Sequence, residues 1–245
     1  AVVDSGKKTW FFVTADYAFG HTLERDTTEV VVANGGKVLG GVKHPINTQD
    51  FSSFMAQAQS SKAEVIGLAN AGGDTIGSVK QAAELGIMGS KQTVVPLLMF
   101  TSDIQALGLR QTAGMVFTEG WYWDFNDSNR KFAERFMKEF KGKAPTSVQA
   151  GVYSATMQYL KAVEATKTDN SDAVMKQMKS VEINDGLFKG RIRADGKFEH
   201  DMYLLEVKKP NESKGPNDVA KVIKVIAAKD ATLPLAQSKC KYVTK

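Results

Sequence analysis

Apolar runs of strand length recur along the chain as far as residue 120. The five runs are KTWFFVTA (8–15), KVLGGVK (37–43), AEVIGLAN (63–70), TVVPLLMF (93–100) and GMVFTEG (114–120). Pro96 interrupts the fourth run. Because proline cannot donate to a sheet ladder, the fourth run is predicted to be an edge strand or an irregular one.

The segments between these runs carry apolar residues at helical spacing. The clearest case is an i, i+3, i+4, i+7 pattern at Phe51, Phe54, Met55 and Ala58. Ranges 20–34 and 74–85 have similar patterns. Strands that alternate with helices predict βαβ units, so we expect an α/β fold with a parallel sheet and right-handed crossovers.

Longer amphipathic helices are predicted after residue 125. One carries Phe132, Phe136 and Phe140 along one face, with Asp127 or Ser128 as its N-cap. A second is predicted at about 147–165 and a third at 171–180. The apolar face of the second consists of Val148, Val152, Ala155, Tyr159 and Val163. Strand-like segments follow, namely GRIRADGKF with a turn at Asp195–Gly196, then DMYLLEVKK and VIKVIAA.

This order of elements is unusual for a complete protein. The later helices have apolar faces but too few following strands to cover them, and the opening AVVDSGKK reads like the end of a helix. We therefore expect the natural protein to have an N-terminal segment that this chain lacks. The single cysteine, Cys240, is then either a free thiol or paired with a cysteine in sequence not shown.

Composition narrows the class of protein. Hydrophobic residues make up 42% of the 245 residues and charged residues 24%, which is ordinary for a soluble globular protein. No apolar run approaches the roughly 20 residues that span a bilayer, so stable membrane insertion is not expected. The net charge is +5, but Lys and Arg are spread along the chain rather than gathered on one element, which disfavours specific nucleic-acid binding.

Catalytic signatures are missing from the sequence. The three histidines, His21, His44 and His200, lack metal-ligand spacing, and there is no G-x-S-x-G, G-x-G-x-x-G or P-loop motif. We therefore expect no catalytic residue, no metal and no cofactor. A carboxylate pair formed by Asp16 and Asp103 leaves a hydrolase as a remaining alternative.

Candidate binding residues follow the predicted strands, because ligands of open parallel sheets bind at the carboxyl ends of the strands. The segments concerned are ADYAFG (15–20), HPINTQD (44–50), NAGGDT (70–75), FTSD (100–103) and GWYWDF (120–125). Their polar, glycine-rich and aromatic character is typical of a small-molecule site.

Three of these segments have a structural alternative as well as a binding one. Tyr17 and Phe19 can flank a ring or an aliphatic chain, although one of the two could be core. Gly72 and Gly73 let the backbone approach a ligand, and Asp74 could simply cap the following helix. In the segment FTSD, Ser102 and Asp103 could bind an ammonium, a hydroxyl or an amide of the ligand. Alternatively, one of them could be the N-cap of a short helix at 103–109.

A family resemblance adds to this picture. KTWFFVTADYAFG, NTQDFSSFMAQAQSSKAEVIGLANAGGDTIGSVKQAAELGI and GMVFTEGWYWDFND resemble type I periplasmic solute-binding proteins. More closely, they resemble the leucine/isoleucine/valine-binding receptors of ABC transporters, and among those the members that bind aromatic acids. The likeness covers nearly the whole chain and is looser in 185–245.

The resemblance implies two Rossmann-like parallel-sheet lobes that are joined by a three-segment hinge and trap the ligand between them. The first lobe would be incomplete here. By likeness, 1–120 is most of the second lobe, 121–125 is hinge and 126–198 returns to the first lobe. Residues 199–232 return to the second lobe, and 233–245 form a C-terminal tail.

The resemblance also suggests individual ligand contacts. Phe19 matches an aromatic contact of the amino-acid binders. The region of Ala71 and Gly72 corresponds to a tyrosine of the family, so that aromatic wall is absent and a ligand bulkier than leucine would fit. The family's ammonium-binding acid falls near Ser102 and Asp103. The complete expected set of ligand contacts is Tyr17, Ala18, Phe19, Asn70, Ala71, Gly72, Ser102, Asp103 and Trp121.

The segment GWYWDF is expected to be one extended hinge strand. Gly120 would supply backbone freedom, Trp121 and Trp123 would share one face, and Tyr122 would pack on the other. Trp121 would then lie at the floor of the cleft, and Trp121→Ala should weaken binding without unfolding the protein.

The function implied is that of a non-catalytic periplasmic receptor. It would deliver an aromatic acid, such as a benzoate or hydroxycinnamate derivative, or a branched-chain amino acid, to inner-membrane ABC permease subunits. A ligand-sensing regulatory domain of the same fold is the alternative, and a hydrolase is the weaker one. Without the rest of the first lobe, the isolated chain should bind weakly or not at all.

Overall fold

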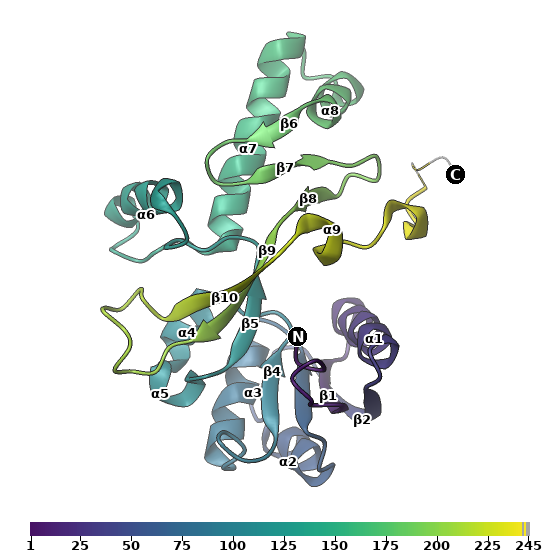
Figure 1. Ribbon diagram of the computed structural model, residues 1–245, viewed down its shortest axis with the longest axis vertical. Coiled ribbons are helices and arrows are strands. Elements are labelled where there is room, and N and C mark those ends of the chain that lie inside the picture. Colours follow the sequence, from purple (N-terminus) through teal and green to yellow (C-terminus); the bar gives the residue numbers. More distant parts are fainter. Residues whose placement is uncertain (242, 244–245) are drawn as a thin grey trace. The chain divides into compact units, whose positions relative to one another are not determined.

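The computed structural model describes residues 1–241 and 243, which fold into two units (Figure 1). The first unit contains Ala1–Thr118 and Leu205–Lys221, and the second contains Glu119–Leu204 and Val222–Lys245. The chain therefore passes between the units three times. Residues 242, 244 and 245 of the expected tail lie outside the described part.

A parallel sheet forms the centre of the first unit, as the alternating pattern predicted. Its order is β2-β1-β3-β4, and each neighbouring pair is parallel. The strands are β1 (Thr9–Ala15), β2 (Lys37–His44), β3 (Val65–Ala69) and β4 (Thr93–Pro96). All five residues of β3 are buried, in keeping with their unbroken apolar sequence. Strand β4 lies at the edge, as Pro96 predicted.

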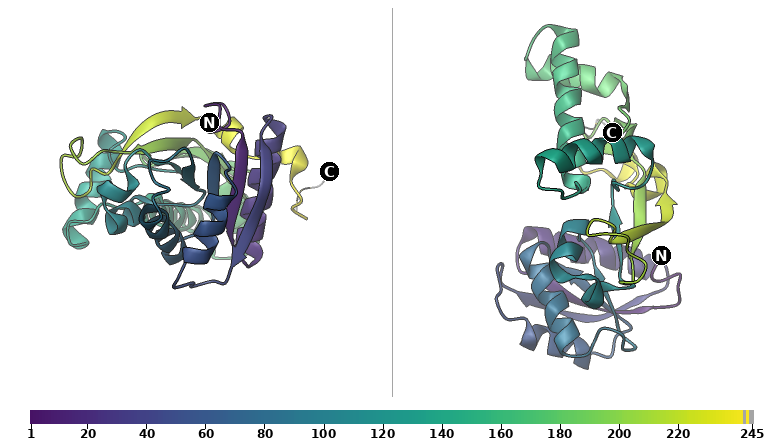
Figure 2. Two further views of the ribbon diagram at one scale, coloured as in Figure 1. Left: turned by 90° about the horizontal axis from the view of Figure 1, so that it is seen from below. Right: turned by 90° about the vertical axis from the view of Figure 1, so that its left-hand side faces the viewer.

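Helices α1 (Ala18–Ala33), α2 (Ser52–Ser60) and α3 (Gly73–Glu84) pack along this sheet (Figure 2). Helices α4 (Thr101–Leu107) and α5 (Leu109–Thr112) pack against α3. A core cluster joins the sheet to α1 through Trp10, Phe12, Val31, Val65 and Val95. Helices α1, α3 and α4 begin three to five residues after β1, β3 and β4, and α2 begins eight residues after β2. The strand-to-helix loops therefore lie at one edge of the sheet.

The fifth apolar run was expected to continue the parallel series, and this expectation was wrong. Strand β5 (Val116–Glu119) instead belongs to a separate three-stranded sheet of order β10-β9-β5, with β9 (Met202–Val207) and β10 (Ala220–Ile226). The three passages of the chain between units fall within these three strands.

The unit boundaries differ from the lobe boundaries expected from the resemblance. Residues 199–204 and 222–232 were assigned to the second lobe with 1–120, but they group with the other unit. Residue 120 lies two positions beyond the observed boundary at Thr118. The assignment of these units to the lobes of a complete receptor stays a prediction.

The described part of the second unit contains four α-helices and a small antiparallel sheet. The helices are α6 (Asp127–Glu139), α7 (Ser147–Thr166), α8 (Ser171–Ser180) and α9 (Ala228–Ala231), with a 3-10 turn at Leu235–Gln237. The sheet has the order β6-β7-β8, with β6 (Glu182–Asn184), β7 (Lys189–Ile192) and β8 (Phe198–His200). The turn at Asp195–Gly196 joins β7 to β8, with Gly196 at a φ of 82°, so the predicted turn is confirmed.

The N-cap of α6 is not one of the two residues expected from the sequence. Asn126, not Asp127 or Ser128, is the cap, and its side chain accepts a hydrogen bond from the Asn129 N–H. Asn126 has an extended backbone, and asparagine is as good a cap as aspartate or serine, so the helix starts one residue earlier than expected.

Candidate functional site

The candidate site lies at the carboxyl edge of the first unit's parallel sheet. Strands β1, β3 and β4 are neighbours and run in the same direction, so the segments that follow them emerge at one edge. The structure therefore brings together the segments that contain Tyr17, Ala71 and Ser102. This is the place where open α/β sheets bind small molecules.

The segment ADYAFG presents an aromatic pair at this edge. Tyr17 is 38% exposed, Phe19 is half-buried, and their ring centroids lie 5.7 Å apart. Ala18 is exposed beside them. A Cβ at Gly20 would lie 2.1 Å from the Ala15 carbonyl oxygen, so only glycine allows α1 to start this close to the strand ends.

Asn70 is fully buried at the end of β3 and is engaged by protein groups. Its amide nitrogen donates to His44 Nε2 and to Ser78 Oγ, both at 3.1 Å. Its amide oxygen accepts from the Thr75 hydroxyl at 2.9 Å. These bonds favour a role in which Asn70 holds the loop in place. Its expected direct contact with a ligand is left without support.

His44 completes this buried network. Its Nδ1 lies 2.8 Å from the Pro45 carbonyl oxygen, which can only accept, so Nδ1 carries the proton and Nε2 accepts from Asn70. The ring meets Phe51 edge-on at 4.8 Å. The sequence analysis considered His44 as a metal ligand and as the start of the candidate segment HPINTQD, and nothing in the sequence linked it to Asn70. The pairing follows from the structure, in which His44 ends β2 and Asn70 follows β3.

The rest of NAGGDT forms the open part of the loop. Helix α3 begins at Gly73, and Gly72 is its N-cap at a φ of 56°, so Asp74 lies inside the first turn and is not the cap considered for it. The Asp74 carboxylate instead accepts from the Asn47 N–H at 3.2 Å. Ala71 is half-buried and Gly72 exposed, so both reach the surface of this unit.

In the segment FTSD, the hydroxyl of Ser102 is exposed and the carboxylate of Asp103 is hydrogen-bonded within the protein. Ser102 is exposed, whereas Asp103 is 9% exposed and accepts a hydrogen bond from the Phe100 N–H at 2.9 Å. Burial raises the pKa of the Asp103 carboxyl, and the Phe100 N–H opposes that rise. The N-cap role considered for Ser102 or Asp103 is therefore wrong, because Phe100 is the N-cap of α4, which begins at Thr101, two residues earlier than expected. Asp103 lies at the third helical position and its carboxylate accepts from the N–H of that cap.

The segment GWYWDF is not the extended strand that was expected. Strand β5 ends at Glu119, and a turn follows in which the Phe125 N–H donates to the Tyr122 carbonyl. Trp121 and Tyr122 are both buried, at 0% and 4% exposure, and Trp123 packs against the same cluster as Trp121. The expected alternation of faces stays a prediction. A turn forms here, rather than an extended strand, and it leads the chain from β5 into α6, which begins at Asp127.

Trp121 lies in the core of the second unit. Its ring meets Phe132 edge-on at 5.8 Å, and Ala133, Ala150 and Phe188 belong to the same cluster. Within the described residues, its indole nitrogen has no hydrogen-bond partner. This burial favours a structural role, so Trp121→Ala is now expected to destabilise the unit. The expected contact of Trp121 with a ligand stays an untested prediction.

The expected hinge residues Gly120, Tyr122 and Trp123 follow the first passage between the units. Gly120 does not have a positive φ, and a Cβ there would lie 2.9 Å from His200 Cε1. The close approach of the His200 ring, rather than a need for backbone freedom, therefore explains why residue 120 is glycine. The hinge role of these three residues stays a prediction.

The described part of the chain has neither a cluster of metal-binding side chains nor a helix suited to cross a membrane. Residues 1–241 and 243 contain no group of three or more His, Cys, Asp or Glu side chains that could hold a metal ion. Over the same residues, no helix combines the length and the apolar character needed to cross a membrane.

The fold is that of an open α/β protein, and the edge at its strand ends is of the kind where such proteins bind small molecules. The chain belongs to the periplasmic binding protein family, whose model matches residues 1–216. Its fold is that of a type I periplasmic binding protein, as the resemblance implied.

Several proteins that are similar to this chain are named as periplasmic or Leu/Ile/Val-binding proteins. A crystal structure of a periplasmic binding protein from Burkholderia mallei is 51% identical, with a TM-score of 0.95 over 99% of this chain and 64% of that chain. A branched-chain amino acid ABC transporter periplasmic ligand-binding protein from Burkholderia xenovorans LB400 is 36% identical, with a TM-score of 0.86 over 98% and 64%. Leu/Ile/Val-binding protein homolog 6 of Brucella melitensis is 31% identical over 86% of this chain and 55% of its own. The chain thus spans about half the length of that relative.

Proposed function

We propose that this chain is the larger part of an extracytoplasmic solute-binding receptor of an ABC importer. The observation that carries the proposal is the shared carboxyl edge of β1, β3 and β4, which holds the aromatic pair Tyr17 and Phe19, the turn at Gly72 and the exposed Ser102 hydroxyl. Membership of the periplasmic binding protein family supports it. In this proposal the protein is not an enzyme, works in the periplasm and passes its ligand to membrane permease subunits.

The proposed ligand is a small carboxylate-bearing molecule with an apolar body. Tyr17 and Phe19 offer ring faces for that body, and Ser102 offers a hydroxyl. Because Ala71 and Gly72 stand where the resemblance implies a tyrosine, we favour an aromatic acid of the benzoate or hydroxycinnamate type over leucine. The Burkholderia xenovorans protein is named for branched-chain amino acids, so these remain the second ligand class.

The test is calorimetric titration of two proteins. One is this chain alone. The other, called the completed chain below, joins it to the part of the Burkholderia mallei protein that the match leaves uncovered. We expect the completed chain to bind benzoate or 4-hydroxycinnamate, and the chain alone to bind weakly or not at all. Tight leucine binding without aromatic binding would contradict the aromatic assignment.

The alternatives are separated by simple readouts. A hydrolase would cleave an added ester or amide. Recovery of that ester or amide unchanged after incubation would therefore contradict the hydrolase alternative. A ligand-sensing regulatory domain would bind ligand but give no ligand-dependent association with membranes that contain the cognate permease. Lack of binding to every aromatic acid and every branched-chain amino acid would contradict the receptor proposal.

A further inference from the structure

An ion pair flanks the aromatic pair of the candidate site. Asp16 directly follows β1, and its Oδ1 lies 2.7 Å from Nε2 of His21, near the start of α1. Tyr17 and Phe19 lie between these two residues in the sequence. The Asp16 N–H donates to the His44 carbonyl at 2.8 Å, and the His21 N–H donates to the Tyr17 carbonyl at 3.0 Å. The ion pair and the aromatic pair therefore belong to one ordered segment at the carboxyl edge of the sheet.

The hydrogen bond between the two side chains leaves one oxygen of Asp16 open. A carboxylate only accepts, so Nε2 of His21 carries the proton of this bond. Within the described part of the chain, the side chain of Asp16 makes no other hydrogen bond. The side chains of Asp16 and His21 are 54% and 43% exposed. His21 thus orients the carboxylate through Oδ1, and Oδ2 is available to a second donor.

A hydroxyl on an aromatic ring is a donor that suits this oxygen. Tyr17 and Phe19 offer ring faces to the body of the ligand. Beside them, the Asp16 carboxylate can accept a short, charge-assisted hydrogen bond from an O–H on that body. A ring without a hydroxyl would displace water from the carboxylate and return no hydrogen bond.

The charge of Asp16 also gives the ligand a direction. A carboxylate on the ligand is repelled by the carboxylate of the protein, so the acid end of the ligand lies away from Asp16. Ser102, the hydroxyl proposed for the ligand, follows β4, which is two strands away from β1 in the sheet. The two ends of an aromatic acid can therefore be held by different groups along the same edge.

A structural role alone gives the ion pair little to do, because exposed ion pairs add little to stability. The other use considered for Asp16 was a carboxylate pair with Asp103. The structure gives the two carboxylates different partners, since Asp103 accepts from the Phe100 N–H and Asp16 accepts from His21. Recognition of a ligand group is therefore the use that the open oxygen of Asp16 favours.

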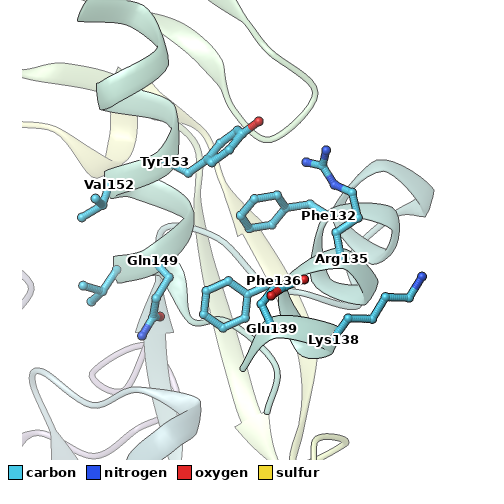
Figure 3. Close-up of a pocket in the computed structure, with 9 residues that line it drawn as sticks. Phe132, Arg135, Phe136, Lys138, Glu139, Gln149, Val152 and Tyr153 are labelled. Carbon is cyan, nitrogen blue, oxygen red and sulfur yellow. The ribbon is translucent and has the colours of Figure 1, made fainter. Parts of the chain in front are cut away.

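The second unit has an aromatic groove that could receive the same ring. It lies between α6 and α7, has a volume of about 750 Å³ and is lined by Phe132 and Tyr153, whose ring centroids are 5.0 Å apart (Figure 3). The cations Arg135 and Lys138 belong to its lining and would attract the carboxylate of an aromatic acid. Binding in this groove would not depend on Asp16, which belongs to the first unit. Substitution of Asp16 therefore distinguishes the two surfaces.

We propose that Asp16 selects aromatic acids that carry a hydroxyl on the ring, and that His21 is the positioning residue that holds its carboxylate. The inference rests on the proposed receptor function and narrows its ligand class to acids of the 4-hydroxycinnamate type. Neither residue was among the ligand contacts expected from the sequence.

The experiment compares two ligands that differ only by the hydroxyl. 4-Hydroxycinnamate and cinnamate are titrated calorimetrically into the completed chain, its Asp16→Ala variant and its Asp26→Ala variant. Asp26 is the matched control, because it pairs with Arg25 on α1 at the same 2.7 Å, with side chains 58% and 61% exposed. We expect the parent to bind 4-hydroxycinnamate about tenfold or more tightly than cinnamate. Asp16→Ala should remove this preference, and Asp26→Ala should keep it.

His21 is tested by rescue with a conservative variant. His21→Gln keeps an N–H donor for the Asp16 carboxylate, whereas His21→Leu removes it. We expect His21→Leu to lose most of the preference for the hydroxylated acid and His21→Gln to keep most of it. The affinity for cinnamate should stay within about twofold in both variants, because a lost carboxylate orientation affects only the hydroxyl. Thermal unfolding should show both variants as stable as the parent.

Equal affinities of the parent for the two acids would overturn the proposal, and this result needs no variant. An Asp16→Ala variant that weakens both acids by the same factor would also overturn it. Loss of leucine binding in that variant, with aromatic binding unchanged, would assign the carboxylate to an ammonium instead. If cinnamate binds and the hydroxyl makes no difference, the receptor function stands and this inference alone fails. If no aromatic acid and no branched-chain amino acid binds, the receptor proposal fails and this inference fails with it.

Discussion

The backbone of Gly120 and the ring of His200 pack so closely that a side chain cannot stand between them. A Cβ on Gly120 would lie 2.9 Å from His200 Cε1 and 3.5 Å from the Met202 sulfur. The ring cannot easily move away, because Phe198 and Phe188 hold it at centroid distances of 4.8 Å and 5.2 Å. The glycine after β5 is therefore a packing requirement within the second unit.

Gly120→Ala should destabilise the protein. Overpacking a filled site typically costs about 1–3 kcal/mol, and we expect a loss of unfolding free energy in that range. Denaturant unfolding monitored by circular dichroism measures it. Gly151→Ala is the matched control, because a Cβ there has nothing within 4 Å and alanine favours α7. Equal losses in both variants would contradict the packing explanation.

His200 should also make stability depend on pH. Burial lowers the pKa of its imidazole below the ordinary value of 6.5, so the folded state binds a proton less readily than the unfolded state. Its contribution to stability is therefore present above about pH 6.5 and is lost as the pH falls below that value. Unfolding free energies at pH 7.5 and 5.5 should fall more for the parent protein than for His200→Gln. A parallel fall in both would assign the effect to other groups.

Trp121 should contribute to stability through its packing volume. Trp121→Ala empties a fully buried site against Phe132 and Phe188, and such truncations cost about 3–5 kcal/mol. Trp121→Phe should cost clearly less, because in the described part of the chain the indole N–H has no hydrogen bond to lose. Thermal unfolding of both variants measures the difference. A Trp121→Ala variant as stable as the parent would support the earlier expectation of a contact outside the core.

The sequence was sufficient to predict the parallel sheet and most of its helices. Alternation of apolar runs with helical spacing gave four strands and three helices of the first unit within a few residues, and Pro96 identified the edge strand. It did not give the pairing of β5, because that strand's partner β9 lies more than 80 residues later and no local pattern specifies such a pairing.

The candidate site was only partly predictable. The position of Tyr17, Ala71 and Ser102 at one edge follows from the common direction of the strands, because the alternating pattern predicted a parallel sheet. The sequence could not show that Asn70 and Asp103 are taken up by protein partners, because hydrogen bonding depends on which loops meet. The role of Trp121 could not be predicted for a similar reason, because an aromatic residue after a strand is equally compatible with a ligand surface and with a core.

Asn70 should affect stability through the network that it joins. Asn70→Asp keeps the size of the side chain but removes the amide donor to His44 and Ser78, leaving buried groups unpaired at a cost of about 1–3 kcal/mol. Asn34→Asp is the matched control, because the Asn34 amide donates to Val30 at an exposed helix end. Denaturant unfolding compares the two. A loss at Asn70 no larger than at Asn34 would contradict the network.

Ala71 should affect ligand choice rather than stability. Ala71 is half-buried, Gly72 beside it is exposed, and a Cβ on Gly72 or Gly73 would have nothing within 4 Å, so the loop has room for a larger neighbour. Ala71→Tyr would restore the aromatic wall that the family resemblance implies at this position. In the completed chain we expect it to weaken binding of 4-hydroxycinnamate by about tenfold or more, because the ring would occupy space that the bulkier ligand needs.

The control for Ala71→Tyr is Ala106→Tyr, which adds the same side chain at an exposed position of α4 away from the strand ends. Calorimetry should show an unchanged affinity for that variant, and thermal unfolding should show both variants as stable as the parent. If Ala71→Tyr leaves the aromatic affinity unchanged, the space at Ala71 and Gly72 does not determine ligand size. If it raises the affinity for leucine while lowering that for the aromatic acid, this one position separates the two ligand classes.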